Sequence, residues 1–494
     1  MHESDPVSNE RQVYCNRTMN LRSIKAIGYD MDYTLVHYRV DEWERVAFEH
    51  GRRGLALRGW PVEHLSFEPR SVIQGLVFDL ELGNLVKASR FGYVVRSHHG
   101  VRPLSFDEQR NAYGSAFVDL NEDRWEFMNT LFSLSEASLF AQLVEMFDAA
   151  PLAGVRTYRE LHRAVRQALD EAHTGGELKA RIVADPDSFV ERDPELGLTL
   201  LDQFYAGKAL VLITNSDWAY TRAMMSYAID SYLPDGMTWR DLFRFVIVEA
   251  NKPRFFSDRQ ALYQVVDEQQ GLLQPHRGAL EEGSVYAGGH AGLVENSLGL
   301  RGAEILYVGD HLFGDVHVSK AMLRWRTGLI LPELEGEIRA MVAFADTEAR
   351  LAELMATKTD LDRQLASLRL ARLRARHGYA DPDDDAAKLE RQMRELVRDA
   401  VALDAQIAPL ARAAGEVGNL MWGPMMRAGV DKSLFARQVE RYADLYTSRV
   451  SNFLHATPFG YLRATRSNLP HDVVDTPRPA TSLDEVPVGV PPNQ

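Results

Sequence analysis

Short apolar runs that end in polar or acidic residues recur along the chain. These runs are Ile24–Tyr29, Ala209–Ile213, Phe245–Val248, Ile305–Val308 and Gly328–Leu331. A short, continuous apolar run is typical of a strand that is buried on both faces of a parallel sheet. Helical stretches separate the runs, so the pattern predicts an α/β fold with a doubly wound parallel sheet. Ligands in such folds bind at the carboxyl ends of the strands.

The first two runs are separated by a segment of about 180 residues, which is far too long for an ordinary connection. Helical periodicity at Asn129–Phe147 and Tyr158–His173 indicates that this segment has a structure of its own. We therefore expect an inserted cap domain. The predicted division is 1–40 for the first core strand, 41–200 mainly for the cap, and 201–345 for the rest of the core.

The C-terminal third of the chain has a different composition. From Thr347 to Gly415 it is rich in Leu, Ala and Arg at helical spacing, with an acidic turn at Asp381–Asp385. This pattern predicts an antiparallel helical hairpin over 346–415. We expect a helical segment over 416–470 that packs on the core or at an oligomer interface. The Pro-, Val- and Asp-rich residues 471–494 predict a flexible tail.

Composition narrows the class of protein. With 494 residues and 45% hydrophobic content, the chain can form a sizeable core and more than one domain. Its 56 basic and 70 acidic residues give a net charge of −14 without a broad basic stripe, which argues against a nucleic-acid partner. The single cysteine, Cys15, excludes an intramolecular disulfide and a Cys-rich zinc site. The polar N-terminus and the lack of a long apolar run predict a cytoplasmic protein without a membrane partner.

Asp30 and Asp32 follow the first apolar run and are the first candidates for chemistry. A carboxylate at a strand end is rigidly placed and can attack phosphorus. A second carboxylate two residues on can protonate the leaving oxygen and then activate water. Two acidic residues at this spacing arise readily by chance among 70, so a solvated surface pair is the alternative.

Three further elements follow later strands. The second run is followed by hydroxyl and amide donors that suit phosphate oxygens or a helix N-cap, namely Thr214, Asn215 and Ser216. Lys252 could neutralise charge on the nucleophile and phosphate, or be a surface residue. Asp310 and Asp315 suit a hard cation with oxygen ligands, or belong to a turn. Four such elements in this order argue against coincidence.

This order of motifs resembles the haloacid-dehalogenase superfamily, and more closely the cytosolic purine 5′-nucleotidases, which favour inosine and guanosine monophosphates. The resemblance covers about Arg11 to His471. The motifs that carry it are DMDYTL at 30–35, QGLVFD at 74–79, NTLFSL at 129–134, ITNSD at 213–217, KP-x-FF at 252–256, YVGDHLFGD at 307–315, WRT at 325–327 and FARQVERYADLY at 435–446.

The resemblance implies a role for each candidate. Asp30 would be the nucleophile and a Mg²⁺ ligand, and Asp32 the acid/base, ligating Mg²⁺ through its backbone carbonyl. Asp310 would complete the metal ligands, with Asp315 supporting them. Lys252 would act beside the phosphate-binding residues, which are Thr214, Asn215 and Ser216.

The cap carries candidates for base recognition. Arg166, Asp170 and His173 are spaced by four and three residues, so a helix places them on one face. The resemblance assigns them to the nucleobase, whereas spacing alone also fits an exposed Arg–Asp pair. Thr174 stands where the family pattern has Tyr. Phe147 could stack on the base, although an apolar helix position is more often core.

The sequence thus predicts a Mg²⁺-dependent 5′-nucleotidase that acts on purine nucleoside 5′-monophosphates through an aspartyl phosphate. Phosphoryl transfer to a nucleoside and a homo-oligomer, dimer or tetramer, are further expectations from the family. Two alternatives stay open. One is a phosphatase for another phosphomonoester, and the other is a non-catalytic interaction protein, which the intact acidic set disfavours.

Overall fold

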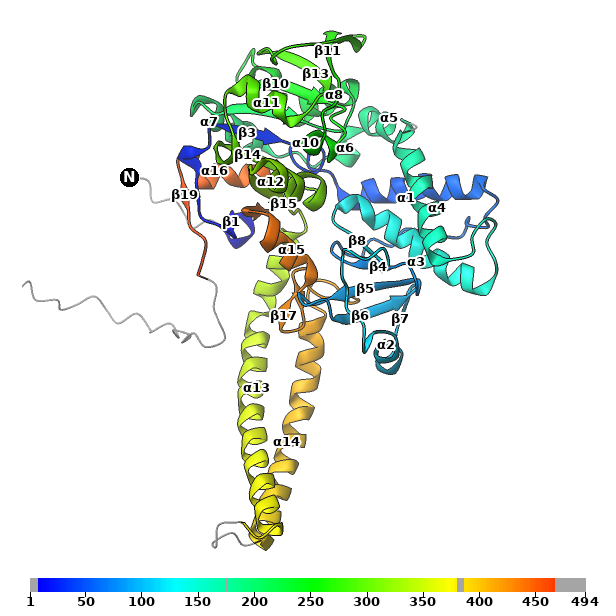
Figure 1. Ribbon diagram of the computed structural model, residues 1–494, viewed down its shortest axis with the longest axis vertical. Helices are drawn as coiled ribbons and strands as arrows, with labels where there is room; N and C mark the ends of the chain where they lie inside the picture. The colour runs from blue at the N-terminus through cyan, green and yellow to red at the C-terminus, as the bar shows by residue number, and fades with distance from the viewer. Residues whose placement is uncertain (1–7, 175, 380–385, 467–494) are drawn as a thin grey trace, which may run out of the picture.

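A ten-stranded mixed sheet forms the core of the protein, in the upper part of the computed structural model in Figure 1. The structure describes residues 8–174, 176–379 and 386–466. The predicted acidic turn Asp381–Asp385 and tail 471–494 lie outside the described residues.

Seven neighbouring strands of this sheet run parallel. In spatial order they are β18 (Leu445–Thr447), β15 (Arg326–Ile330), β14 (Ile305–Gly309), β3 (Ala26–Tyr29), β9 (Ala209–Ile213), β10 (Phe243–Val248) and β13 (Ser284–Gly288). Antiparallel strands form the edges, namely β1 (Tyr14–Cys15) on one side and β11 (Leu262–Asp267) and β12 (Leu272–Pro275) on the other.

Both faces of the sheet are buried. Along β9, Leu210 and Leu212 belong to one apolar cluster, and Val211 and Ile213 to a second. Such alternation into two cores requires helices on both faces, so the predicted doubly wound α/β fold is confirmed. The helices of the core are α7 (Pro194–Tyr205), α8 (Trp218–Ile229), α9 (Trp239–Leu242), α10 (Arg254–Ser257), α11 (Ala291–Leu298) and α12 (Val318–Leu323).

Most of the segment between β3 and β9 forms the body at the right of Figure 1. Its helices are α1 (Val40–Leu57), α2 (Phe106–Tyr113), α3 (Leu134–Ala149), α4 (Tyr158–Thr174), α5 (Glu177–Ala184) and α6 (Pro186–Phe189). It also holds a five-stranded antiparallel sheet that the sequence did not predict, in the order β7 (Arg102–Pro103), β6 (Val94–His99), β5 (Asn84–Ala88), β4 (Val77–Asp79) and β8 (Trp125–Phe127). These strands are short and several carry charged residues, which hides them from a periodicity argument.

The segment 416–470 is not purely helical, which corrects the prediction. It contains α15 (Leu434–Tyr442) and α16 (Phe453–Ala456), but between them β18 pairs in parallel with β15 of the core sheet. Asp444, just before β18, is buried and forms ion pairs with Lys320 and Arg326. A strand of three residues is too short to be predicted from its pattern.

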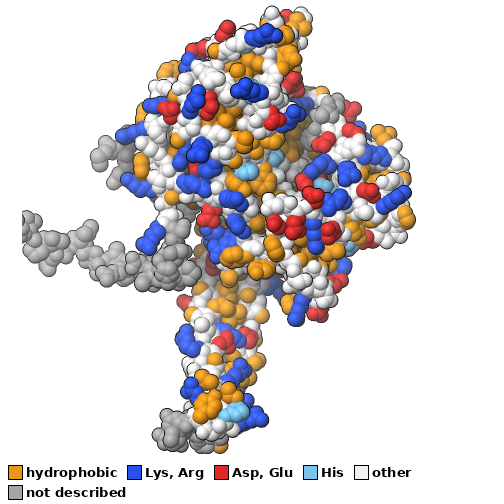
Figure 2. Space-filling model, in the orientation of Figure 1, with side chains coloured by type: hydrophobic (Ala, Val, Ile, Leu, Met, Phe, Trp, Pro, Cys, Tyr) orange, Lys and Arg blue, Asp and Glu red, His pale blue; other side chains and the backbone are white. Residues whose placement is uncertain are grey.

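Helices α13 (Leu334–Arg376) and α14 (Ala386–Gly415) form an antiparallel pair that projects from the body (Figure 1). Their shared seam is apolar, with Leu354, Leu403 and Ile407 at its centre. On the face shown in Figure 2, acidic and basic side chains are interspersed over the body. Among the described residues, no helix is long and apolar enough to cross a bilayer.

Candidate active site

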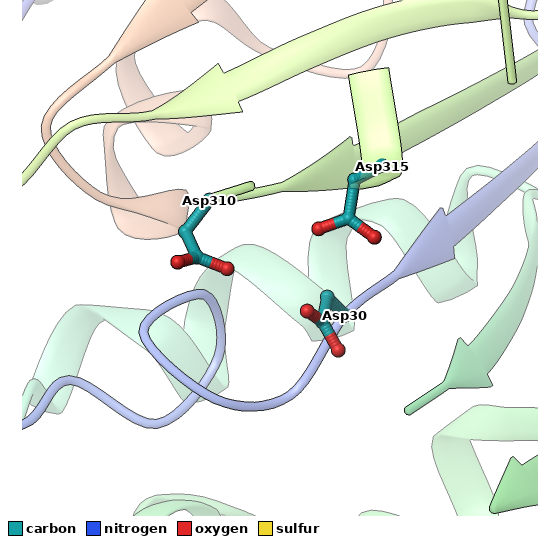
Figure 3. Close-up of side chains that lie close together, drawn as sticks. All are labelled: Asp30, Asp310 and Asp315. Carbon is teal, nitrogen blue, oxygen red and sulfur yellow. The ribbon is translucent and has the colours of Figure 1, made fainter. Parts of the chain in front are cut away.

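Three buried carboxylates meet at the carboxyl end of the parallel sheet. Asp30 directly follows β3, and Asp310 directly follows the neighbouring strand β14. Asp315 lies in the helical turn Leu312–His317 that comes next. One ligand oxygen from each carboxylate lies within 4.8 Å of the others, and the three side chains converge in Figure 3. The strand order therefore places these residues together.

Local backbone geometry fixes Asp315 in this group. Its Oδ2 accepts a hydrogen bond from the His311 backbone N–H at 3.2 Å. A Cβ on Gly309 would lie only 2.5 Å from the same Oδ2. Any larger residue at position 309 would therefore displace the Asp315 carboxylate.

Lys252 lies in the loop after β10 and is buried against the carboxylates. Its Nζ is 2.7 Å from Asp30 Oδ1 and 2.9 Å from Asp315 Oδ1, and it donates to the Tyr307 hydroxyl at 3.1 Å. Its side chain is only 5% exposed, so the surface alternative is excluded.

Asn215 holds the Lys252 backbone from both sides. Its Oδ1 accepts from the Lys252 N–H at 2.6 Å, and its Nδ2 donates to the Lys252 carbonyl at 3.2 Å. The Asn215 side chain is therefore used to position Lys252. The part of this segment left for a phosphate is its backbone and the side chains of Thr214 and Ser216.

The cluster carries strongly shifted protonation equilibria. Burial raises the pKa of Asp30 to about 7, against the opposing effect of Lys252. Burial, with Asp30 and Asp315 nearby, raises the pKa of Asp310 well above its ordinary value. Although burial opposes it, the proximity of Asp30 and Asp315 raises the pKa of Lys252 well above its ordinary value. Perturbed groups gathered at a strand-end site are typical of catalytic centres.

The donor set fits a hard divalent cation. When ionised, the three carboxylates carry a charge of −3, and Lys252 neutralises one of these charges, which leaves a net charge of −2. Buried carboxylate oxygens with a net charge of −2 are the ligands and the charge that Mg²⁺ prefers.

The Asp32 side chain points to the segment 214–216 instead of joining this group. Its Oδ2 accepts from Ser216 Oγ at 2.7 Å, and its Oδ1 accepts from the Tyr38 hydroxyl at 2.7 Å. Within the segment, the Ser216 N–H donates to Thr214 Oγ1 at 3.1 Å. The helix N-cap is Asp217, which accepts from the Tyr220 N–H at 2.9 Å. Residues 214–216 are therefore not the cap of α8.

Cap residues that the sequence did not single out contact Asp310, Ser216 and the loop after Asp30. Thr130 Oγ1 donates to Asp310 Oδ2 at 3.3 Å, and Lys179 Nζ donates to Ser216 Oγ at 3.2 Å. The Phe132 ring lies 4.8 Å from that of Tyr33, in the loop after Asp30. Thr130 and Phe132 belong to the NTLFSL motif, which could have signalled them. A single lysine such as Lys179 gives no sequence signal.

Three of the predicted base-binding residues lie on α4. Arg166 bonds Glu136 at 3.1 Å and Glu126 at 3.0 Å, so its guanidinium is engaged within the cap. Asp170 lies one turn further along, and partial loss of its solvation raises its pKa. His173 lies in the last turn, and its side chain is outside what the structure describes.

Phe147 is not brought to the carboxylates. Its ring packs against Tyr158 at 5.5 Å near the C-terminal end of α3. Phe132 precedes the same helix, about 20 Å away along its axis at the rise of an α-helix. The aromatic side chain beside the loop after Asp30 is therefore Phe132, whereas the stacking of Phe147 on a base stays a prediction.

Three buried carboxylates in contact with a buried lysine at one strand edge are the kinds of group that a phosphohydrolase site uses. The model of the 5′ nucleotidase family matches residues 13–474, and the chain belongs to this family.

Two relatives match nearly the whole chain. A 5′-nucleotidase domain-containing protein of Dictyostelium discoideum is 27% identical over 475 residues, covering 94% of this chain and 76% of that protein. The 5′-nucleotidase domain-containing protein 2 of Rattus norvegicus is 27% identical over 485 residues, covering 94% and 80%. A solved haloacid dehalogenase-like family hydrolase from Xanthomonas campestris is 13% identical, with a TM-score of 0.25, over 62% of this chain and 82% of that one. That last likeness is too slight to support an argument.

Proposed function

We propose that the protein is a Mg²⁺-dependent 5′-nucleotidase that hydrolyses purine nucleoside 5′-monophosphates through an aspartyl phosphate on Asp30. The observation that carries this proposal is the direct contact of Asp30 with Lys252, beside Asp310 and Asp315 and opposite the Asp32–Ser216 pair. Nucleophile, charge neutraliser, acid/base and phosphate donors are thereby gathered at one strand edge.

The hydrogen bonds on Asp30 select the attacking oxygen. Lys252 Nζ and the Met31 N–H both lie 2.7 Å from Oδ1, and among the described residues no bond to Oδ2 is found. In the first step Oδ2 forms a bond to phosphorus, the bond to the ester oxygen breaks with its electron pair, and Asp32 gives that oxygen a proton. In the second step Asp32 takes a proton from water while the water oxygen bonds phosphorus. The electron pair of the Asp30–phosphorus bond then returns to the carboxylate.

The metal would be held by the Asp30 and Asp310 carboxylates and the Asp32 backbone carbonyl, with Asp315 supporting them. It would offset the charge of carboxylate and phosphate in close approach. Thr214 and Ser216 would bind the phosphate oxygens, and Lys252 would hold the nucleophile and balance its charge.

The proposed substrate class rests on the cap. The α4 face with Arg166 and Asp170 leads along the chain to α5, whose Lys179 contacts Ser216. A polar helix face that ends at a phosphate-binding loop suits a nucleotide, since base and phosphate are then read at opposite ends. The names of the relatives agree with a 5′-nucleotidase, and the preference for a purine is part of our proposal.

Phosphate release from a substrate panel tests the proposal. The panel contains inosine, guanosine, adenosine, cytidine and uridine monophosphates, glucose 6-phosphate and an aryl phosphate, each with and without Mg²⁺. We expect the largest kcat/KM for purine monophosphates and no turnover without the metal. A preference for the sugar phosphate would identify another phosphomonoesterase. No release from any substrate would favour the non-catalytic alternative.

Two further expectations are proposals of the same kind. Phosphoryl transfer would be detected by adding a labelled nucleoside to the reaction and measuring the labelled nucleotide that forms from it. Light scattering would separate a monomer from the proposed homo-oligomer.

A further inference from the structure

Two buried tyrosines form a hydrogen-bonded chain that ends on the Asp32 carboxylate. The Tyr38 hydroxyl donates to Asp32 Oδ1 at 2.7 Å, and the Tyr220 hydroxyl lies 2.9 Å from that of Tyr38. Tyr38 is 2% exposed and Tyr220 is 3% exposed. A phenol has one proton, and Tyr38 uses it on the carboxylate, so Tyr220 is the donor within the pair.

This chain of donors assigns different roles to the two oxygens of Asp32. The Tyr38 hydroxyl accepts from Tyr220 and so gives its own proton to Oδ1, whereas the Ser216 hydroxyl can rotate and accept from Oδ2. A proton carried by the carboxyl group therefore resides on Oδ2. Oδ2 is the oxygen that faces the phosphate-binding segment, where Ser216 Oγ lies 2.7 Å away. A phosphate that binds at Ser216 would meet this oxygen and not the one held by Tyr38.

We propose that Tyr38 is a positioning residue that confines the transferable proton of Asp32 to Oδ2 and aims it at the leaving oxygen, with Tyr220 fixing the Tyr38 hydroxyl. This inference rests on the proposed phosphohydrolase function. It assigns a role to two residues that lie outside the motifs of the sequence.

The surroundings of Tyr38 make it a rigid support. Its ring centroid lies 5.2 Å from that of Tyr33 and 4.5 Å from that of Trp43. The neighbouring backbone is tied to the end of the cap, because the Arg39 N–H donates to the Phe189 carbonyl and the Glu191 N–H donates to the His37 carbonyl, both at 2.7 Å. The hydroxyl therefore cannot follow a rotation of the Asp32 carboxylate, which makes it a fixed reference for that group.

The step that depends on Tyr38 is the breaking of the ester bond. The electron pair of the phosphorus–oxygen bond passes to the leaving oxygen, which takes the proton from Asp32 Oδ2 and departs as an alcohol. An alkoxide leaves poorly without this proton, whereas 4-nitrophenolate is stable as an anion and leaves without it. A misplaced proton on Asp32 therefore slows the reaction only for esters with poor leaving groups.

The test is Tyr38→Phe, measured as kcat/KM for a nucleoside monophosphate, an alkyl phosphate, phenyl phosphate and 4-nitrophenyl phosphate with Mg²⁺. This parameter reports the steps up to departure of the leaving group. We expect a loss of about 10- to 100-fold for the nucleotide and the alkyl ester, as for loss of a charge-assisted hydrogen bond at an acid catalyst. The loss with 4-nitrophenyl phosphate should be about threefold or less. Tyr220→Phe should show the same trend more weakly.

Tyr29→Phe is the matched control. Tyr29 is also a fully buried tyrosine and directly precedes Asp30, but its hydroxyl bonds Gln203 at 2.7 Å. This variant should change kcat/KM by the same factor for every ester. If Tyr38→Phe does likewise, or changes nothing, the positioning role is wrong.

Folding and substrate assignment are separated within the same experiment. Retained turnover of 4-nitrophenyl phosphate shows that the Tyr38→Phe site is folded, and a variant that loses it together with all other esters counts against the proposal. Wild-type protein that cleaves aryl and alkyl phosphates but not nucleotides would overturn the substrate proposal alone. The dependence on leaving group would still test Tyr38.

Discussion

The core site and the α4 face of the cap position their polar residues in different ways. Asp30 and Asp310 each stand at the end of a strand, and the order of one parallel sheet brings them together. Arg166 and Asp170 stand on a helix of the inserted segment, and Arg166 is held by two glutamates of the cap. The core positions depend on backbone pairing, whereas the cap positions depend on side chains.

This difference separates chemistry from selectivity. A sheet edge holds reacting groups to the tolerance that catalysis needs, and it does so for every substrate. A cap helix such as α4 can change its side chains without disturbing that edge, because contacts that join the cap to the edge, such as Thr130–Asp310 and Lys179–Ser216, come from other cap segments. Variants of the nucleophile and of the cation-binding carboxylates proposed here should therefore affect all phosphate esters alike, and variants of the α4 face should affect some esters more than others.

The largest effect should follow from Asp30→Asn. The amide is not a nucleophile, so turnover of every ester should fall by about 10⁴-fold or more, as for loss of the nucleophile in other covalent enzymes. Phosphate release and the melting temperature should be measured together. The fold should be retained, because the amide removes a carboxyl group that burial disfavours in its charged form. Turnover close to that of the wild type would remove Asp30 from its role.

The next effect concerns the metal. Chelation should abolish turnover, and Asp310→Ala should lower it by about 10²- to 10⁴-fold for nucleotide and aryl phosphate alike, without rescue by moderate Mg²⁺. Asp258→Asn serves as the control, since Asp258 is a surface carboxylate of the core that pairs with Arg254. If Asp310→Ala lowered turnover of the nucleotide but not of the aryl phosphate, the proposed difference between core and cap residues would be wrong.

Much of the core site could be predicted because it follows from strand ends. Apolar runs identify buried strands from sequence alone, and parallel pairing then gathers whatever follows them. Asp30, Thr214, Lys252 and Asp310 all belong to this class. The same reasoning missed β18, which has three residues and gains its place from the buried Asp444 beside it.

The remaining parts of the site depend on contacts between distant segments. Tyr38 and Tyr220 are 182 positions apart, and no local pattern predicts that their hydroxyls meet. Phe132 and Phe147 are both aromatic residues around one helix, and only its direction shows that Phe132 lies at the site. Selectivity is therefore harder to predict than chemistry.

The cap residues should give a smaller and selective effect. Asp170→Ala and His173→Ala should narrow the gap in kcat/KM between purine and pyrimidine monophosphates by about 1–3 kcal/mol, the size of a lost buried polar contact. Lys252→Ala should instead depress all substrates together. Gln167→Ala, on an exposed part of the same helix, is the control and should leave the gap unchanged. If the Asp170 and His173 variants slow an aryl phosphate as much as inosine monophosphate, the cap does not read the base.

The smallest effect on activity is expected at Glu44, which joins two cap helices away from the reacting atoms. Glu44 is fully buried on α1, and its Oε2 accepts from the Ser135 N–H of α3 at 2.8 Å. Burial raises the pKa of its carboxyl from 4.5 to about 8. The folded protein therefore keeps this proton up to about pH 8, whereas the unfolded chain releases it near pH 4.5. Because the unfolded state binds fewer protons in that window, the free energy of unfolding falls as pH rises through it.

Glu44→Gln should remove this loss of stability at high pH, because the neutral amide has no proton to release and still offers an oxygen to the Ser135 N–H. Urea unfolding should show similar stabilities of variant and wild type near pH 5. Near pH 8.5 the variant should be more stable by about 4 kcal/mol. Glu42→Gln makes the same substitution at a half-buried position of α1 that pairs with Arg45, and is the control variant. Turnover of 4-nitrophenyl phosphate should stay at the wild-type level, because the sheet edge and not the cap positions the reacting groups. An equal difference in stability at both pH values would mean that Glu44 is charged in the folded cap. A loss of aryl phosphate turnover would mean that cap packing does reach the chemistry.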